Sequence, residues 1–488
     1  MVDGIDDRAA SRRVLGATSA GSSALAVDRT VLRRFLLGLA EGMNAADESV
    51  DRIGETMDAV SRAYGQDDTD FIVLPTVILV QTGSAEEGRV AIRSVKANFR
   101  FDQVAALYRL IEEARRGAVE PLEGIRRLNA IGVMRPRYGW LVRTLGHAIL
   151  TTGLALLLAP TWQGAVVAFV LGAFVGLAKL VRSPTLQLVF PVFAAFACAL
   201  AVFLIAPYVE IGDPIRLLIA PLATFLPGGV LTTGTMELAA DQMVAGASRL
   251  VFGLVQLALL SFGILAAGTV IGVANASYAP LDPSQGLPWW VAPLGVLLFA
   301  IGNHLHFSAP PSTFGWVLLV LIVAYAGQAV GTTLIGATVS GFIGALAMTP
   351  VVLWIAGLRH GAPSQLTFLP AFWLLVPGAA GLVSLTEAVG TGAGLEDFAT
   401  ALTSVMSITL GVLIGVALYR VGRRGAEEIG QFHVDVPAAL AETEAPPLWA
   451  RFVPGTPNSF WGHRRRHRGA GADAAVVASA PSPRKAES

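Results

Sequence analysis

The stretch that decides the fold is Pro221–Arg249, with the sequence PLATFLPGGVLTTGTMELAADQMVAGASR. An apolar run reaches Pro227-Gly228-Gly229 and then continues past three threonines to a single acidic residue, Glu237. Proline lacks an amide N–H and glycine is conformationally free, so this tripeptide predicts a break in a helix. Inside a bilayer, such a break is tolerated only where its backbone is buried in protein or lines a cavity.

The same pattern returns 150 residues later in Pro370–Gly390, with the sequence PAFWLLVPGAAGLVSLTEAVG. Pro377-Gly378 occupies the place of Pro227-Gly228. Glu387 follows ten residues after its proline, as Glu237 does in the first copy. We therefore interpret the two stretches as the two halves of one transport site.

The composition predicts a membrane protein. Hydrophobic residues make up 54% of the 488 residues and charged residues only 14%, against about 25% charged in a typical soluble domain. Only 13 of the 70 Asp, Glu, Lys and Arg lie between Thr144 and Tyr419, which predicts an apolar core between soluble ends. The zero net charge suggests no nucleic-acid partner, and Cys198 alone cannot form an intrachain disulfide.

The amino-terminal third predicts a small α+β domain over residues 28–135, after a disordered, polar segment 1–27 without the apolar region of a signal peptide. From Asp28 the apolar spacing predicts one helix or two. Further along, two segments predict strands and two predict amphipathic helices: Asp70–Gln81 and Gly88–Ala97, then Phe101–Arg116 and Pro121–Ile131.

Ten apolar segments follow, each close to the roughly 20 residues that a bilayer crossing needs. The predicted spans are 141–159, 163–181, 186–207, 214–239, 250–274, 288–303, 314–331, 333–357, 365–389 and 400–420. The first five, in residues 138–274, correspond in position to the second five, in residues 288–424. Residues 425–488 are rich in Pro, Ala and charge and predict a disordered tail, whose run His463–Arg468 can touch anionic lipid or stay solvated.

An odd number of spans in each repeat inverts the second half relative to the first, a recurrent design of secondary transporters. The distribution of Lys and Arg predicts the orientation, because cytoplasmic connections carry an excess of them. With the amino terminus inside, the outer connections hold only Arg216. The inner segments hold Arg135, Arg137, Arg143, Lys179, Arg182, Arg249, Arg359, Arg420, Arg423 and Arg424. We therefore expect both termini in the cytoplasm.

Glu237 and Glu387 are the candidate proton-coupling residues, because a carboxylate in a membrane span is costly and points to function. Each can take a proton or hold the ammonium group of a zwitterion. The alternative is that each sits near the interface, where it pairs with an arginine or caps a helix. Ten residues of helix place the carboxylate about 15 Å from the break, which keeps this alternative open.

The candidate substrate-binding residues surround the two breaks. A half-helix that starts at Gly228, Gly229 or Gly378 presents amide N–H groups and the positive end of its dipole, which suit a carboxylate. The hydroxyls of nearby residues can bond a polar substrate or their own helix backbone. These are Thr232, Thr233, Thr235, Ser384 and Thr386.

Asn303, His304 and His306 lie together at a predicted inner membrane edge. The two histidines can relay protons or serve as interfacial residues. Without Cys or acidic neighbours they do not form a metal site, so no metal and no cofactor is expected. The chain contains neither a GxxxxGK[ST] phosphate loop nor a GxSxG nucleophile motif, which argues against an ATP-driven pump and against a catalytic role.

Taken together, these segments resemble the bacterial threonine/serine exporter family from about Val31 to Tyr419. The most specific matches are LLGLAEGMNAADESVDRIGETMDAVSRAYG (36–65), LPTVILV (74–80) and FLPGGVLTTGTMELAADQMVAGASRL (225–250). PAFWLLVPGAAG (370–381) resembles the corresponding part of the family's carboxy-terminal half.

The resemblance implies export of L-threonine and L-serine across the inner membrane, driven by the proton motive force. The partners would be these amino acids, protons and the lipid bilayer. The site residues named above are inferred from this sequence and not taken from the family. Two alternatives stay open: a membrane-anchored enzyme with its active site in the amino-terminal domain, and an exporter of another small polar metabolite.

Overall fold

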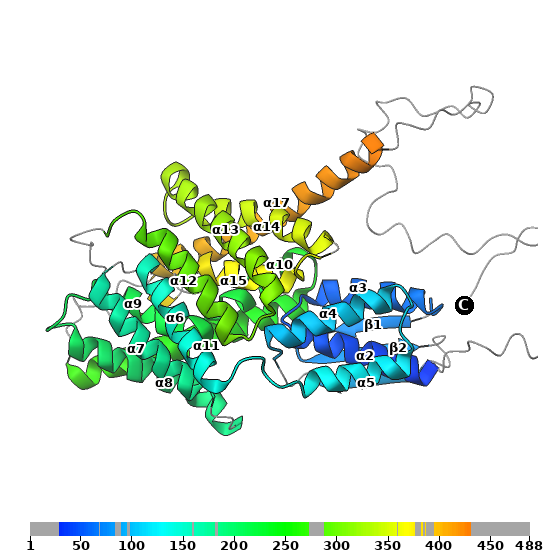
Figure 1. The fold of residues 1–488 in the computed structure, drawn as a ribbon, viewed down its shortest axis with the longest axis horizontal. Coiled ribbons are helices and arrows are strands. Elements are labelled where there is room, and N and C mark those ends of the chain that lie inside the picture. Colours follow the sequence, from blue (N-terminus) through cyan, green and yellow to red (C-terminus); the bar gives the residue numbers. More distant parts are fainter. Residues whose placement is uncertain are drawn as a thin grey trace, which may run out of the picture. The chain divides into compact units, whose positions relative to one another are not determined.

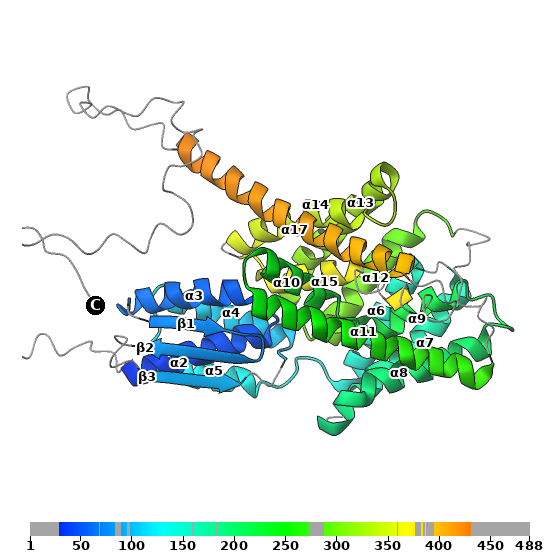
Figure 2. The same ribbon diagram turned by 180° about the vertical axis from the view of Figure 1, so that it is seen from behind.

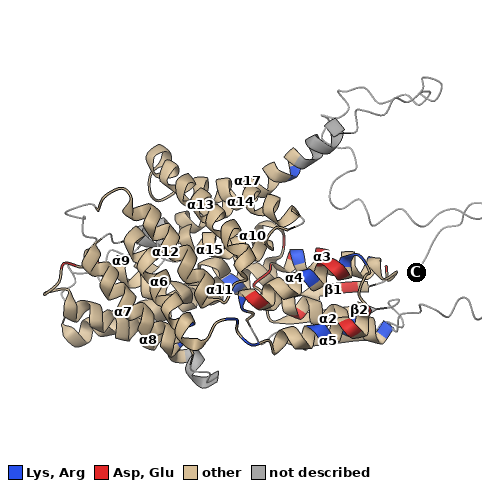
Figure 3. Cartoon of the chain, viewed as in Figure 1, with Lys and Arg blue, Asp and Glu red and all other residues tan. Residues whose placement is uncertain are grey.

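A computed structural model describes residues 29–67, 69–82, 89–94, 98–158, 161–180, 184–272, 287–358, 360–375, 382–383, 386 and 395–430. Two parts are named below: the amino-terminal segment, residues 29–132, and the helical bundle, residues 140–422. Figure 3 shows that acidic and basic residues gather on the amino-terminal segment and are sparse on the helices of the bundle.

The amino-terminal segment contains a three-stranded antiparallel sheet of order β1-β2-β3, against which two of its four helices pack, and the other two helices pack against those two (Figures 1 and 2). The elements are α2 (Arg29–Ala45), α3 (Val50–Ala63), β1 (Thr69–Val73), β2 (Val77–Thr82), β3 (Arg89–Ser94), α4 (Phe101–Arg115) and α5 (Pro121–Gly132). Alternation along the strands turns Ile78 and Val80 toward the helices, where both are fully buried with Phe35 and Met57. Of the one or two early helices that the sequence left open, the structure has two, and the two later helices are confirmed.

The predicted single strand Asp70–Gln81 is wrong. The chain turns at Pro75 and Thr76, where Leu74 and Val77 exchange backbone hydrogen bonds of 2.8 and 3.3 Å. Proline cannot donate to a strand ladder, so this position ends β1 and begins a hairpin with Phe71 opposite Val80. The many β-branched residues on both sides of the turn hid it in the sequence.

The helical bundle contains the apolar helices. They are α6 (Trp140–Leu158), α7 (Trp162–Ala178), α8 (Pro184–Ile205), α9 (Pro214–Leu222), α10 (Gly228–Ala239), α11 (Met243–Ile271), α12 (Val291–His306), α13 (Phe314–Ile335), α14 (Gly341–Gly357), α15 (Ser364–Leu375) and α17 (Leu395–Gly430). Among the described residues, four helices are long and apolar enough to cross a membrane, or five if the bent pair α9–α10 counts as one span. Five shorter apolar helices lie at the other predicted spans, and ten crossings remain a prediction.

Small residues let the first helices of the two predicted repeats approach closely. α6 and α12 pack along their length, and a Cβ atom at Gly302 would lie 2.1 Å from the backbone nitrogen of Leu150. A Cβ at Gly153 would lie 2.4 Å from the backbone nitrogen of Phe299. Such glycine contacts are the usual way in which apolar helices associate where burial of hydrophobic surface gives little driving force.

The two predicted repeats share several helix contacts. α8 packs against α9 and α11, and the corresponding α14 packs against α15 and α17. The second of these contacts is close, since a Cβ at Gly411 of α17 would lie 2.4 Å from the carbonyl oxygen of Phe342 in α14. These contacts recur in both halves, while the repeat itself, its inversion and the domain boundaries stay predictions.

The boundary that the sequence predicted at residues 331–333 is wrong. α13 continues to Ile335, and the turn centres on Gly336, which has a φ of +87°. Glycine adopts this conformation without steric cost, whereas Gly331 packs inside the helix pair against Ser340. The sequence signal of a glycine followed by two threonines was therefore a packing position and not a helix end.

Candidate functional site

The candidate site is the break between α9 and α10. α9 ends at Leu222, a short 3-10 turn covers Ala223–Phe225, and α10 starts at Gly228 with its axis bent by 68° from that of α9. Leu226 between them is extended. The predicted break at Pro227-Gly228-Gly229 is thus confirmed, and it follows from the missing N–H of proline.

Side chains from neighbouring helices bond the polar groups of the break. Nε2 of Gln256 in α11 donates to the carbonyl oxygen of Phe225 at 2.7 Å. The hydroxyl of Thr224 lies 3.1 Å from Nε2 of His147 in α6. The Lys179 ammonium lies 4.7 Å from the centre of the Phe225 ring, over its face, which is a cation–π contact. The break is therefore held in one position by α6, α11 and the end of α7.

His147 is fully buried and joins three elements. Its Nδ1 lies 2.8 Å from the carbonyl oxygen of Gly172 in α7, and a carbonyl can only accept. Nδ1 is therefore the protonated nitrogen, and Nε2 accepts from Thr224. The His306 ring of α12 stands edge-on to His147 with centroids 4.7 Å apart, and its Nδ1 donates to the Arg143 carbonyl at 3.0 Å.

His147 was not predicted from the sequence, although one signal was present. An ionisable residue within a predicted span is a candidate functional residue by default. Of the predicted trio near residue 303, His306 reaches this interior cluster, while His304 turns toward Tyr138 at 3.4 Å. The side-chain amide nitrogen of Asn303 is buried and has no hydrogen-bond partner in the part of the chain that the structure describes.

The predicted substrate residues of the first half lie in the first turns of α10. Gly228 and Thr232 are buried, and Gly229 and Thr233 are partly exposed. Thr232 is 1% exposed and its hydroxyl has no hydrogen-bond partner among the described residues, whereas Thr235 donates to its own helix at the Leu231 carbonyl at 2.9 Å. A role of Thr232 in substrate binding stays a prediction.

Glu237 lies at the other end of α10 and is also buried. Its Oε2 forms an ion pair of 3.0 Å with Nε of Arg249 in α11. Its Oε1 accepts from the backbone N–H of Val50, the first residue of α3, at 3.0 Å. Arg249 in turn donates to the carbonyl oxygen of Glu48 at 3.3 Å. These are the arginine pairing and helix capping that the sequence left open as an alternative to proton coupling.

The group around Glu237, Arg249, Glu48 and Val50 is called the junction, because it ties the amino-terminal segment to α10 and α11. Ser49, the residue before α3, makes no side-chain capping bond, so Glu237 satisfies an N–H that the helix cannot satisfy itself. Glu48 also accepts from the Tyr108 hydroxyl. Burial, reinforced by the Glu48 charge, raises the pKa of Tyr108 well above its ordinary value.

The second predicted half of the site falls largely outside the described residues. Gly378, Ser384 and Glu387 are not described, and α15 leads toward them. Thr386 is described and donates to the Ser261 hydroxyl of α11 at 3.2 Å. In the described part of the chain, no three His, Cys, Asp or Glu side chains are placed to hold a metal ion.

Apolar helices of spanning length, a broken helix among them and a polar cluster at the break define a helical multi-pass membrane protein. Residues 34–271 match the family model described as "Putative threonine/serine exporter", so this region is similar to that family.

Curated relatives are distant. A "Probable threonine/serine exporter" of Mycobacterium tuberculosis is 25% identical over 82% of this chain and 79% of its own length. An uncharacterized protein of Schizosaccharomyces pombe is 22% identical over 76% of this chain, and the "Pheromone-regulated membrane protein 10" of Zygosaccharomyces rouxii is 24% identical over 78%. The chain spans less than half the length of these two fungal relatives, 45% and 42%. No solved structure matches it significantly.

Proposed function

We propose that the protein is a secondary active exporter of L-threonine and L-serine, driven by the proton motive force through proton antiport. It would act by alternating access in a bacterial inner membrane, with ten spans in two inverted repeats and both termini in the cytoplasm. The family match and the mycobacterial relative support the substrate class. The observation that supports the mechanism is a helix broken at Pro227, close to a buried threonine, Thr232, that has no hydrogen-bond partner among the residues the structure describes.

In this proposal the break binds the amino acid. The first turn of α10 has amide N–H groups without helical acceptors and the positive end of the helix dipole, both of which suit the substrate carboxylate. These N–H groups belong to residues at and after Gly228. The Thr232 hydroxyl would bond the hydroxyl that threonine and serine share. The repeat would supply Gly378 and Ser384 as the matching half.

The proposed proton carriers are Glu237 and Glu387. An ionised Glu237 accepts from Val50 and pairs with Arg249; a protonated one loses its attraction for Arg249. Loading a proton would therefore loosen the junction and free α10 to move. One proton entering the cell releases about 2.3 kcal/mol per 100 mV, which drives export of a zwitterion against a gradient of about fiftyfold.

The experiment is efflux of labelled threonine from proteoliposomes preloaded with it, with and without an imposed proton gradient. We expect efflux of threonine that depends on the gradient and that serine, but not leucine, inhibits by competition. Efflux that ignores the gradient would contradict antiport and leave a facilitator. An absence of threonine movement, with the protein folded, would contradict the substrate.

The proton carriers are tested by Glu237→Gln and Glu387→Gln in the same assay. Glutamine keeps the size of the side chain and cannot ionise, so the variant that replaces the carrier should retain threonine exchange and lose its dependence on the gradient. Unchanged proton-coupled export in both variants would rule out both residues.

A further inference from the structure

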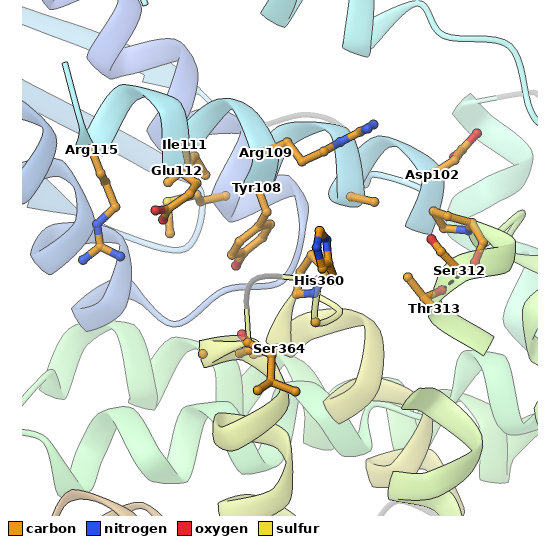
Figure 4. Close-up of a pocket in the computed structure, with 18 of the residues that line it drawn as sticks. Asp102, Tyr108, Arg109, Ile111, Glu112, Arg115, Ser312, Thr313, His360 and Ser364 are labelled. Atoms are coloured by element: carbon orange, nitrogen blue, oxygen red, sulfur yellow. Dashed lines mark hydrogen bonds between the residues drawn. The ribbon is translucent and has the colours of Figure 1, made fainter. Parts of the chain in front are cut away.

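A large cavity lies apart from the break, where the amino-terminal segment meets the turn before α13, the end of α14 and the start of α15 (Figure 4). Its volume is about 1170 Å³. One wall is the exposed face of α4 with Tyr108 and Arg109, and the opposite wall carries Thr313 and Ser364. The stacked rings of Phe101 and Phe307, 5.0 Å apart, hold the two parts together next to it.

The cavity is strongly basic. Six arginines line it, against two acidic residues: Arg52, Arg109, Arg115, Arg116, Arg135 and Arg137, with Asp102 and Glu112. The acids are already engaged, because Asp102 pairs with Arg100 at 3.1 Å and Glu112 with Arg116 at 3.9 Å. Within the described part of the chain, Arg109, Arg115, Arg135 and Arg137 make no ion pair.

A second feature of the cavity points to a ligand. Ser364 is the first residue of α15, lines the cavity and is 6% exposed, and its hydroxyl has no hydrogen-bond partner within the described part of the chain. A buried hydroxyl normally has a partner, which a bound molecule can supply. The first turn of α15 adds amide N–H groups that no helical carbonyl can satisfy, at the positive end of the helix. Figure 4 shows Ser364 and His360 across from Tyr108.

We propose that this cavity binds a small, multiply charged oxyanion through phosphate or carboxylate groups. Guanidinium groups bind the oxygens of both groups in pairs, and the α15 amino end with Ser364 receives one oxyanion while Arg109 and Arg115 receive another. A zwitterion such as threonine has no net charge to match this field. The site is therefore distinct from the break and does not rest on the proposed substrate.

The bound anion would join the amino-terminal segment to α15. α4 and α15 contact each other, and the stacked rings of Phe101 in α4 and Trp373 in α15 lie 6.3 Å apart. α15 also packs against α10, where a Cβ atom at Gly229 would lie 3.9 Å from the Leu369 side chain. An anion that holds α4 and α15 together would thus act on the helix pair that contains the break, which makes the site regulatory.

The test is calorimetric titration of the full-length protein in detergent with pyrophosphate and, separately, with citrate, in a chloride buffer of matched ionic strength. We expect saturable binding of at least one, weakened about tenfold or more in Arg109→Gln/Arg115→Gln because two charge-assisted contacts are lost. Ser364→Ala should weaken it less. The matched control is Arg126→Gln, an exposed arginine on α5 outside the cavity, which should bind as the parent does.

Comparing pyrophosphate, citrate and a lipid competitor shows which kind of anion the cavity binds. Tighter binding of pyrophosphate indicates a phosphate ligand, and tighter binding of citrate a carboxylate ligand. Competition of pyrophosphate by phosphatidylglycerol in nanodiscs would assign the phosphate to a lipid headgroup. Binding of neither anion, equal binding in the double variant, or an equal loss in Arg126→Gln would overturn the proposal. Failure of threonine transport leaves this test unaffected.

Discussion

Buried polar side chains form an ion pair at the junction and neutral hydrogen bonds at the break. At the junction, Glu237 and Arg249 are both charged, lie 3.0 Å apart and are at most 8% exposed. At the break, His147 is fully buried and its bonds to Gly172 and Thr224 are between neutral groups. The junction lies where the bundle meets the amino-terminal segment, and the break lies among apolar helices.

The difference follows from the cost of removing charge from water. A buried ion pair is tolerated only when its geometry is good and further hydrogen bonds satisfy its atoms, which Val50 and Glu48 provide at the junction. A neutral imidazole avoids that cost deeper in the bundle. We conclude that a charged pair holds the carboxy-terminal end of α10 at the junction, while neutral hydrogen bonds hold the turn that precedes α10 at the break.

The largest expected effect is at the junction. Arg249→Met leaves the buried Glu237 carboxylate without its partner, and we expect a loss of about 3–5 kcal/mol in the free energy of unfolding. Thermal unfolding in detergent measures it. The matched control is Arg216→Met, which removes a half-exposed arginine paired with Asp213 and should cost less than about 1 kcal/mol.

A double variant sharpens this result. Arg249→Met together with Glu237→Gln removes both charges, so it should be more stable than Arg249→Met alone. If Arg249→Met is no more harmful than Arg216→Met, the ion pair does not hold the junction and the contrast with the break fails.

A smaller effect is expected at the break. His147→Leu keeps the apolar packing and leaves the Gly172 carbonyl and the Thr224 hydroxyl without partners, which should cost about 1–3 kcal/mol in the free energy of unfolding. It should also lower the rate of export, because the break loses a contact that positions it. The control is His304→Leu, whose ring contacts Tyr138 at a longer 3.4 Å. Equal losses in the two variants would contradict a special role for His147.

Sequence reasoning reached the elements of both regions because the signals were local. The break follows from Pro227-Gly228-Gly229, and the helices of the amino-terminal segment follow from apolar spacing of three and four residues. The prediction was wrong where one local sequence pattern is compatible with two structures. The β-branched run around Pro75 concealed a turn, and Gly331 was a packing contact rather than a helix end.

The partners could not be predicted, because they are distant in the chain. Glu237 meets Val50 across 187 positions, and His147 meets Thr224 across 77. Such contacts depend on how whole helices pack, and one sequence without its homologues contains no signal for that. The cavity could not be predicted either, because its arginines come from separate elements: α3, α4 and the connection to α6.

The smallest expected effect comes from an exposed ion pair in the amino-terminal segment. This pair tests whether a charged contact stabilises the fold appreciably only where it is buried. Arg127 donates to both carboxylate oxygens of Glu113, at 2.6 and 3.1 Å, and this hydrogen bonding lowers the pKa of Glu113 below its ordinary value. A lowered folded-state pKa stabilises the fold above the unfolded pKa of about 4.3, and the contribution disappears as the pH falls through the folded pKa. Because both side chains are more than a third exposed, the contribution should be under about 1 kcal/mol.

Glu113→Gln should therefore be slightly less stable than the parent at pH 7, with the difference closing below about pH 4. Chemical unfolding at a series of pH values measures it. Added salt should shrink the difference at pH 7, since exposed pairs are screened, while the loss in Arg249→Met should persist because the junction is buried. If added salt reduces the stability loss of Arg249→Met, water reaches the junction. The junction and the break would then differ in solvent exposure and not only in the charge of their contacts.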